Sequence, residues 1–211
     1  MRMITEHKII AIVRGLSKEK IVPTAQALYD GGIRLIEVTF NQSSKTTVED
    51  TANSIKSICE KFGEKICVGA GTVLTIEQVE AAFNAGAKYL ISPNTDVNII
   101  AACKRIGLVS IPGALTPSEV MLAYNSGADL VKLFPAGSLG FDYIRAILAP
   151  LNHIPMLAVG GIDEQNIKEF IDIGMSGVGV GSNIVKNNLI NEGKFDDIKI
   201  LARRYTQAIQ Q

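Results

Sequence analysis

One lysine lies in the middle of an otherwise apolar run, LVKLFP at 130–135. Burying an ammonium group is costly unless the charge is paired or the group loses its proton. A neutral amine with a lowered pKa is the nucleophile that attacks a carbonyl and forms a Schiff base at neutral pH. The same run also fits a lysine whose stem packs while its head reaches solvent. Lys132 is therefore a candidate nucleophile, with a position at the rim of the fold as the alternative.

Two further charges end or interrupt apolar runs. In LIEVTF at 35–40, alternation places Glu37 on the face opposite the apolar residues that must meet helices, so it points into the interior. Such a carboxyl group is either a structural partner for a buried cation or a general acid and base. Arg14 ends the run IIAIVR with a permanent positive charge. Three charges at corresponding depths of three strands indicate an active site, because isolated charges would each need separate compensation.

Glycines gather at two other strand ends. Gly160 and Gly161 follow one strand, and GVGSN at 179–183 closes the next. Backbone amides without side chains in front of them cradle phosphate after the seventh and eighth strands of many barrels. The glycines of each segment alone could merely permit a tight turn, but the two segments together favour a phosphate site. Thr72, in GAGT at 69–72, either hydrogen-bonds a carboxylate or caps a helix.

The elements that carry these residues form repeated βα units. Short β-branched runs are each followed by Gly or Pro and then by a stretch with helical spacing. We predict strands at 9–14, 35–40, 66–70, 89–92, 108–112, 130–135, 155–159 and 177–180. Amphipathic helices lie between them, for example at 75–85 and 163–173, and begin near Ser, Thr or Asp residues that can cap them.

The helices often end in glycine followed by a small or apolar residue, as expected for a left-handed cap. This repeat occurs at Gly32, Gly86, Gly127 and Gly174. Eight such units without a linker predict one domain, residues 1–211, folded as a closed (β/α)8 barrel. The alternative is an open doubly wound sheet, but the first turn reads RGLS where that fold has a GxGxxG motif. A last helix within 193–211 is expected to complete the outer ring.

Composition limits the partners. Lys plus Arg and Asp plus Glu are 21 each, so the formal net charge is zero, and we expect no nucleic-acid partner. No apolar run reaches about 18 residues, which argues against a membrane span and a signal peptide and predicts a cytoplasmic protein. Cys59, Cys67 and Cys103 lack CxxC spacing, and there are only 2 histidines. We therefore expect no metal site, no cofactor and no disulfide.

Six motifs carry a resemblance that runs from about residue 9 to residue 185. They are EVT at 37–39, GAGTV at 69–73, ISP at 91–93, PG at 112–113, KLFP at 132–135 and GG at 160–161. Their order and spacing resemble the 2-keto-3-deoxy-6-phosphogluconate (KDPG) aldolases, a family that includes enzymes acting on 4-hydroxy-2-oxoglutarate (KHG). The resemblance implies a homotrimeric class I aldolase that needs no metal. Its products would be pyruvate and glyceraldehyde 3-phosphate, or pyruvate and glyoxylate from KHG.

The resemblance also implies roles for individual residues. Lys132 would form the Schiff base with the keto acid, and Glu37 would shuttle protons. The pyruvate half would meet Thr72 and the backbone of Pro93, with Phe134 packed beside it. The phosphate would be held by Gly160, Gly161, Gly181 and Ser182.

Two departures leave the substrate open. Asn41 stands where many phosphogluconate-type members carry an arginine for the substrate carboxylate, so we assign that contact to Arg14. Val159 stands where those members have threonine, which removes a hydroxyl near C4 of the substrate. Both features, with SLG at 138–140, resemble the 2-keto-3-deoxy-6-phosphogalactonate (KDPGal) aldolases. Phosphosugar isomerases and epimerases are a more distant alternative that would not require Lys132, and a non-catalytic sensor would leave Lys132 and Glu37 without a task.

Overall fold

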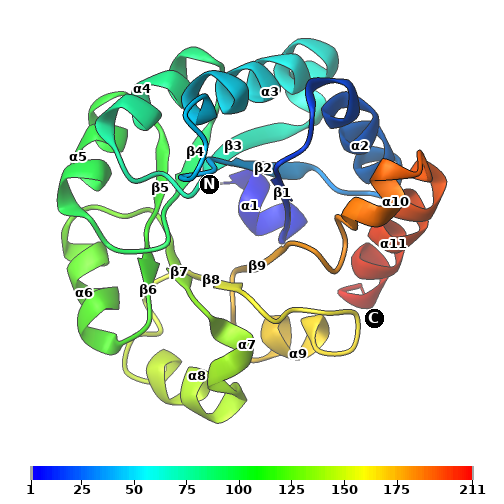
Figure 1. Ribbon diagram of the computed structural model, residues 1–211. Coiled ribbons are helices and arrows are strands. Elements are labelled where there is room, and N and C mark those ends of the chain that lie inside the picture. The colour runs from blue at the N-terminus through cyan, green and yellow to red at the C-terminus, as the bar shows by residue number, and fades with distance from the viewer. Residues whose placement is uncertain (1, 211) are drawn as a thin grey trace.

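Parallel strands surround a single axis in the computed structural model, which describes residues 2–210, and helices cover the outside of the ring (Figure 1). The strand segments are β1 (Ile9–Arg14), β2 (Leu35–Thr39), β3 (Cys67–Gly71), β4 (Tyr89–Ile91), β5 (Val109–Ile111), β6 (Gly113–Ala114), β7 (Val131–Leu133), β8 (Met156–Val159) and β9 (Gly177–Val180). Eight of them have bounds within two residues of a predicted strand, and β6 lies just beyond the strand predicted at 108–112. The short β-branched runs were therefore sufficient to locate them.

Segments β5 and β6 are two parts of one strand, interrupted at Pro112, which has no amide to donate. Segment β5 pairs with β4 and β6 pairs with β7, and the Pro112 carbonyl accepts the Lys132 amide at 2.8 Å. Strand β1 pairs with both β2 and β9, so the ring closes. The predicted (β/α)8 barrel is confirmed, and the open sheet is excluded.

The helices are α1 (Arg2–His7), α2 (Lys18–Asp30), α3 (Thr47–Phe62), α4 (Ile76–Asn84), α5 (Val97–Arg105), α6 (Pro117–Asn125), α7 (Ala136–Leu139), α8 (Phe141–Leu148), α9 (Ile167–Asp172), α10 (Asn187–Asn191) and α11 (Phe195–Ala208), with a 3-10 turn at Gly63–Lys65. Within residues 2–210, no helix combines the length and apolar character that crossing a bilayer requires.

Two predicted helix starts have different outcomes. Thr75 caps α4 as expected, because its hydroxyl accepts the Gln78 amide. The helix predicted to begin at Asp163 starts later, at Ile167. The Asp163 carboxylate accepts the amides of Gln165 and Asn166 at 2.9 and 3.0 Å, which forms a turn before the helix. The prediction of 163–173 was therefore wrong at its start, since the capping side chain stabilises a turn instead.

Four helices end in the same backbone motif, which confirms the internal repeat. Gly32, Gly86, Gly127 and Gly174 adopt left-handed φ values of 95–104° after α2, α4, α6 and α9. The residue after each glycine donates its amide to the carbonyl five residues earlier, at 3.0–3.1 Å. These are Schellman motifs, in which glycine avoids the steric penalty of a left-handed conformation. Each motif turns the chain back toward the next strand.

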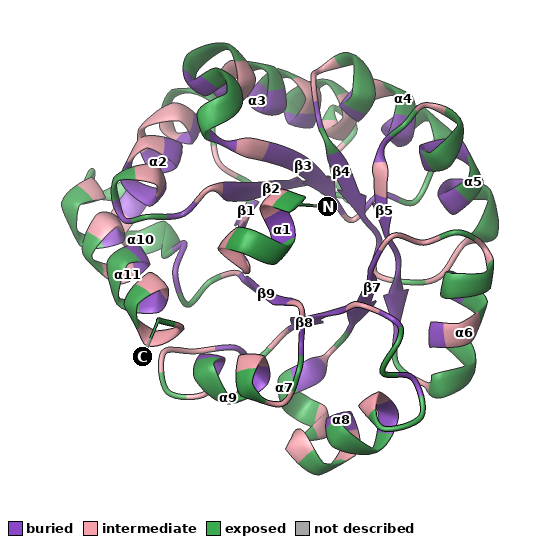
Figure 2. Ribbon diagram, turned by 180° about the vertical axis from the view of Figure 1, so that it is seen from behind, coloured by how far each residue is buried: buried purple, intermediate pink, exposed green. Residues whose placement is uncertain are grey.

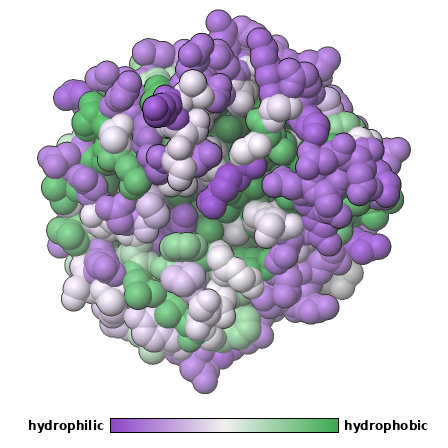
Figure 3. All heavy atoms as spheres, in the orientation of Figure 1, coloured by the Kyte–Doolittle hydropathy of each residue, from purple (hydrophilic) through white to green (hydrophobic). Residues whose placement is uncertain are grey.

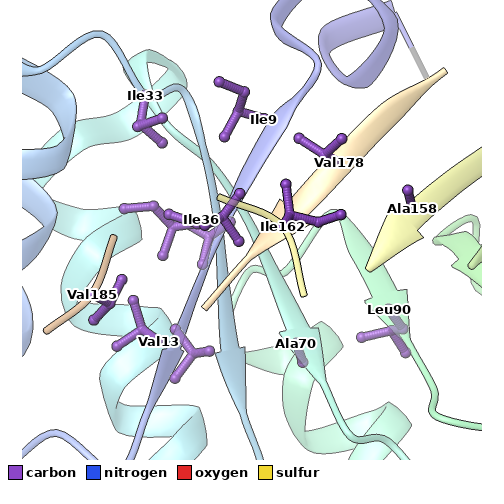
Figure 4. Packing of buried hydrophobic residues seen from close by; sticks show 14 of the residues in the cluster. Ile9, Val13, Ile33, Ile36, Ala70, Leu90, Ala158, Ile162, Val178 and Val185 are labelled. Carbon is purple, nitrogen blue, oxygen red and sulfur yellow. The ribbon is translucent and has the colours of Figure 1, made fainter. Parts of the chain in front are cut away.

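The outward faces of the strands pack against the helices. Ile36, Val13 and Val178 are almost fully buried in this layer (Figure 4). The last helix, α11, closes the outer ring, because its Ile198 and Tyr205 are buried and α11 packs on α2. The predicted closing helix at 193–211 is therefore confirmed over Phe195–Ala208, while residue 211 lies outside the described residues.

The amino end of the barrel is closed by α1, which the sequence analysis did not predict (Figure 2). Ile4 of this helix is 1% exposed and packs on an apolar layer inside the ring. That inner layer comprises Ile10, Leu35, Tyr89, Ile91, Ile111, Leu130, Leu157 and Val159. Access to the interior is consequently limited to the carboxyl end of the strands.

Candidate active site

A cavity of about 440 Å³ opens at the carboxyl end of the barrel. Its lining includes all the residues proposed from the sequence: Arg14, Glu37, Thr72, Pro93, Lys132, Phe134, Gly160, Gly161, Gly181 and Ser182. Its volume suits a small organic ligand. This end is also where (β/α)8 barrels carry their active sites.

Lys132 lies on β7 and points into this cavity. It is only 8% exposed, and its Nζ is 4.7 Å from the centroid of the Phe134 ring. Burial lowers the pKa of this amine, Glu37 opposes that shift, and Arg14 adds to it. The exposed rim position considered for this lysine is therefore wrong. Lys132 has the surroundings of an amine that can be neutral and nucleophilic.

Glu37 on β2 enters the same cavity and is 2% exposed. It depends on Gly71 of β3, since any side chain there would overlap the Glu37 carboxyl group. Burial raises the pKa of Glu37, and the positive charges of Lys132 and Arg14 partly offset that shift. Among the described residues, its Oε2 has no hydrogen-bond partner. A carboxyl group with a raised pKa and an available oxygen is suited to accepting and returning protons.

Three residues extend the cavity beside this pair. Arg14 is the exposed last residue of β1, paired in register with Thr39 of β2. Thr72 follows β3 with a left-handed φ of 56°. Pro93 lines the cavity after β4, and its carbonyl lies against Gly113, where a larger residue would collide with it. Among the described lining residues, Arg14 and Lys132 are the cations.

Asn41 does not line this cavity. It lines a separate cleft of about 360 Å³ beside α2 and α3. Its side-chain Oδ1 accepts the backbone amide of Ser43 at 3.2 Å, and its backbone amide donates to Thr47 Oγ1 at 2.7 Å. Asn41 therefore shapes the loop after β2. This position supplies no group to the cavity, which leaves Arg14 as the exposed cation there.

Glycines shape the opposite side of the cavity. Gly160 and Gly161 have left-handed φ values of 92° and 74°, and a Cβ on Gly160 would press on the Phe134 ring at 3.2 Å. Within the described chain, the amides of Gly161, Ser182 and Asn183 make no backbone hydrogen bond. Consecutive free amides near left-handed glycines form concavities that bind anions.

Two polar side chains of the site, those of Asn183 and Asn187, received no role from the sequence, although Asn183 ends the GVGSN segment. Asn183 Nδ2 donates to the Ile162 carbonyl at 2.8 Å, which joins the loop after β9 to the loop after β8. Its place directly after the GVGS turn was the available signal. Asn187 begins α10 and follows no glycine motif. Its position became apparent only with the fold.

An amine and a carboxyl group with opposite pKa shifts at one carboxyl-end cavity are typical of an enzyme built on a (β/α)8 barrel. The sequence agrees with this class. Residues 1–201 match the family model described as KDPG and KHG aldolase. The chain belongs to this class I aldolase family, whose members are lyases, and the resemblance drawn from the six motifs is confirmed.

Named relatives cover the chain almost completely. The 2-dehydro-3-deoxy-6-phosphogalactonate aldolase of Escherichia coli (strain K12) is 31% identical over 100% of both chains. The 2-dehydro-3-deoxy-phosphogluconate aldolase of Treponema pallidum (strain Nichols) is 34% identical over 96% of this chain and 93% of the relative. These two names differ in the sugar acid. Family membership therefore does not choose between the two C4 epimers.

A solved structure supports the same family. The Legionella pneumophila KDPG aldolase, with pyruvate captured as a covalent carbinolamine intermediate, aligns with a TM-score of 0.85. It is 27% identical, and the alignment covers 95% of each chain. A protein with this fold and a related sequence therefore binds pyruvate covalently.

Proposed function

We propose that the protein is a Schiff-base aldolase that cleaves KDPG to pyruvate and glyceraldehyde 3-phosphate. KDPG is the phosphogluconate-derived acid named for the Treponema relative. The observation that carries the proposal is the buried amine of Lys132 in one cavity with the buried carboxyl group of Glu37. The substrate carries carboxylate and phosphate charges that do not cross a bilayer unaided. We therefore expect the enzyme to act in the cytoplasm.

The reaction begins when the neutral Nζ of Lys132 attacks the C2 carbonyl. The resulting carbinolamine loses water after Glu37 protonates its hydroxyl group, which leaves an iminium ion. The Glu37 carboxylate then accepts the proton of the C4 hydroxyl while the C3–C4 bond breaks. The bonding electrons move into the iminium ion to form an enamine, and the aldehyde leaves. Protonation at C3 and hydrolysis release pyruvate and restore the amine.

The remaining residues orient the substrate. Arg14 and Thr72 bind the carboxylate of the pyruvate half, beside the Pro93 backbone and the Phe134 ring. The phosphate is held by the backbone of Gly160, Gly161 and Gly181 with Ser182. The iminium ion accepts the electrons of the broken bond, so this scheme needs neither a metal nor another cofactor. We expect chelators to leave the activity unchanged, and strong inhibition by EDTA would contradict the scheme.

Borohydride trapping tests the proposal. Reduction in the presence of pyruvate should leave a stable adduct on the tryptic peptide that contains Lys132, identified by mass spectrometry. Lys132→Met should abolish the adduct. Lys104→Met is the matched control, because Lys104 forms a surface ion pair with Asp129 and should not affect trapping. An adduct elsewhere, or cleavage without an adduct, would overturn the assignment; turnover without cleavage would favour an isomerase or epimerase.

KDPGal is the second candidate substrate, and Val159 is the residue that brings it into consideration. This side chain lines the cavity, is 4% exposed and has no hydroxyl to select one C4 configuration. We therefore propose that both epimers are cleaved, and KHG more slowly because it has no phosphate. Retro-aldol rates on the three purified acids test this. A preference of about 100-fold or more for one epimer, a difference of about 2.7 kcal/mol, would contradict shared use.

We also propose that the enzyme is a homotrimer, assembled through the surface over α4 to α6. Large apolar residues 38–49% exposed gather there: Leu74, Ile76, Phe83, Val97, Leu115 and Leu122. Hydrophobic residues appear along this side of the molecule in Figure 3, while α2 and α3 carry a more hydrophilic surface. Exposed apolar patches mark interfaces. Light scattering should give three times the 22.7 kDa chain, and Leu122→Glu should give monomers.

A further inference from the structure

Thr72 has a backbone conformation that needs support. Its φ is 56°, in the left-handed region that β-branched residues rarely adopt. Such a conformation persists only where the surroundings over-determine it, and it is often associated with function. Thr72 lines the cavity at the end of β3. The groups that hold its backbone therefore also fix its side chain in the site.

Three successive carbonyls hold this turn in place. The Gly71 carbonyl accepts the Phe40 amide at 2.9 Å, and the Val73 carbonyl accepts the Ser92 hydroxyl at 2.8 Å. The Thr72 carbonyl between them accepts Nε2 of Gln42 at 2.7 Å. Gln42 lies in the loop after β2. Its side chain thus joins that loop to the turn after β3.

Gln42 is itself held by Gln78, a residue of α4 that is 3% exposed. Gln78 Nε2 donates to Gln42 Oε1 at 3.0 Å. Gln78 Oε1 accepts the amides of Leu74 and Thr75 at 2.7 and 3.3 Å. A chain of hydrogen bonds therefore runs from the start of α4 through two side-chain amides to the Thr72 carbonyl.

The matching position on α6 shows what Gln78 adds. Glu119 occupies the same place in a capping box, and its carboxylate accepts the amides of Leu115 and Thr116 at 2.8 Å. A carboxylate is therefore sufficient for the cap. The NH2 group of Gln78 has no part in capping, and its use in this structure is the hydrogen bond to Gln42.

We propose that Gln42 and Gln78 form a tether that positions Thr72 for the carboxylate of the pyruvate half. This inference rests on the proposed function. Both are positioning residues, since neither lines the cavity. The tether sets the affinity for the 2-keto acid and takes no part in proton transfer.

Two variants test the tether. Gln42→Leu removes the donor at an exposed side chain, and Gln78→Glu keeps the cap, as Glu119 shows, but cannot donate to Gln42. Each should raise KM for the keto acid, and the pyruvate concentration for half-maximal borohydride trapping, about fivefold to tenfold. The kcat should stay within about twofold, because the lost contact stabilises ground state and transition state alike. Glu119→Gln is the matched control and should leave both constants unchanged.

A double-mutant cycle separates positioning from a general structural role. In a Thr72→Ala background, Gln42→Leu should change KM by less than about twofold, because the tether acts through the Thr72 hydroxyl. The tether would be overturned if Gln42→Leu raised KM equally with and without Thr72→Ala, or if Gln42→Leu alone left KM unchanged. If Gln78→Glu fails to fold, Gln42→Leu decides. Failure of the unaltered protein to trap pyruvate would instead overturn the proposed function, and the tether with it.

Discussion

The two ends of the barrel are built from the same strands and differ in almost every other respect. On β2, Leu35 belongs to the inner apolar layer, and Glu37 two residues later lies in the cavity. Leu130, just before β7, and Lys132 repeat this arrangement. Side chains two residues apart share a face of a strand. A shift of two residues toward the carboxyl end therefore leads from the apolar layer to the cavity.

This difference shows where the fold gains stability and where it loses some. The amino end, sealed by Ile4 of α1, buries apolar side chains. At the carboxyl end, burial disfavours the charged forms of both Lys132 and Glu37. Within residues 2–210, the buried oxygens Glu37 Oε2 and Thr39 Oγ1 at this end have no hydrogen-bond partner, and neither has the Tyr89 hydroxyl of the inner layer. Substitutions at the two ends should therefore have opposite effects on activity and stability.

The largest effect is expected for Lys132→Met. Loss of the nucleophile should reduce retro-aldol turnover by about 10⁴-fold or more. Replacing a buried amine by an apolar side chain should not lower the urea midpoint. Steady-state assays and urea denaturation followed by circular dichroism measure the two quantities. Turnover within about tenfold of the unaltered protein would remove Lys132 from the chemistry.

The reverse pattern is expected for Ile4→Ala at the amino end. A cavity left under α1 should lower the free energy of unfolding by about 2–4 kcal/mol. The kcat/KM should stay within about twofold, because the reacting groups lie at the other end. Thr5→Ala on the exposed face of α1 is the matched control and should change stability by less than about 0.5 kcal/mol. A large loss of activity with unchanged stability would contradict the assignment of stability to the amino end and activity to the carboxyl end.

Glu37→Gln should lower kcat by about 10²-fold, since the amide cannot exchange the proton. The variant also has a pH signature in stability. Burial raises the pKa of folded Glu37 above its ordinary value of 4.5, so the folded state favours the protonated form. The unaltered protein then loses stability as pH rises from that value through the raised pKa, and the variant does not.

The stability advantage of Glu37→Gln should therefore be larger at about pH 8 than at about pH 4. Urea denaturation at the two pH values measures it. An advantage that shrinks as pH rises would mean that Glu37 is stabilised as a carboxylate. In that case its role would be structural pairing with a cation.

Arg14→Ala should raise KM about tenfold, through loss of a charge-assisted hydrogen bond to the substrate carboxylate. The increase should be alike for the phosphorylated acid and for KHG, because both contain the pyruvate half. Parallel kinetics on the two substrates provide the measurement. An effect confined to the phosphorylated acid would make Arg14 a phosphate ligand instead.

The smallest effect is expected for Val159→Thr. A hydroxyl added near C4 should shift the ratio of kcat/KM for the two epimers about fivefold toward KDPG, the size of one net hydrogen bond. Rates on both purified epimers give the ratio. An unchanged ratio would show that position 159 does not read the C4 configuration.

The sequence was sufficient for features that depend on local patterns. The apolar runs located the strands, and Lys132 and Glu37 were noticeable because charges interrupt those runs. The glycine caps after α2, α4, α6 and α9 were evident for a similar reason, since each is a local backbone requirement.

Features that depend on distant residues were not accessible in this way. Helix α1 has only 6 residues, too few for a clear helical period, and Ile4 gains its partners only when the ring forms. Asn41 was considered for its place in a motif, yet its side chain serves its own loop. The bond between Gln42 and Gln78 joins residues 36 positions apart, and no local pattern encodes it.

The closed ring has a consequence for how the chain is made. Strand β1 finds β2 early in synthesis, but its second neighbour is β9, at Gly177–Val180 near the other end of the sequence. Until β9 emerges from the ribosome, one edge of β1 presents unsatisfied backbone groups that can pair with another chain. Contacts between such distant segments also form slowly. Nascent chains that end before β9 should therefore aggregate more readily than chains that include it.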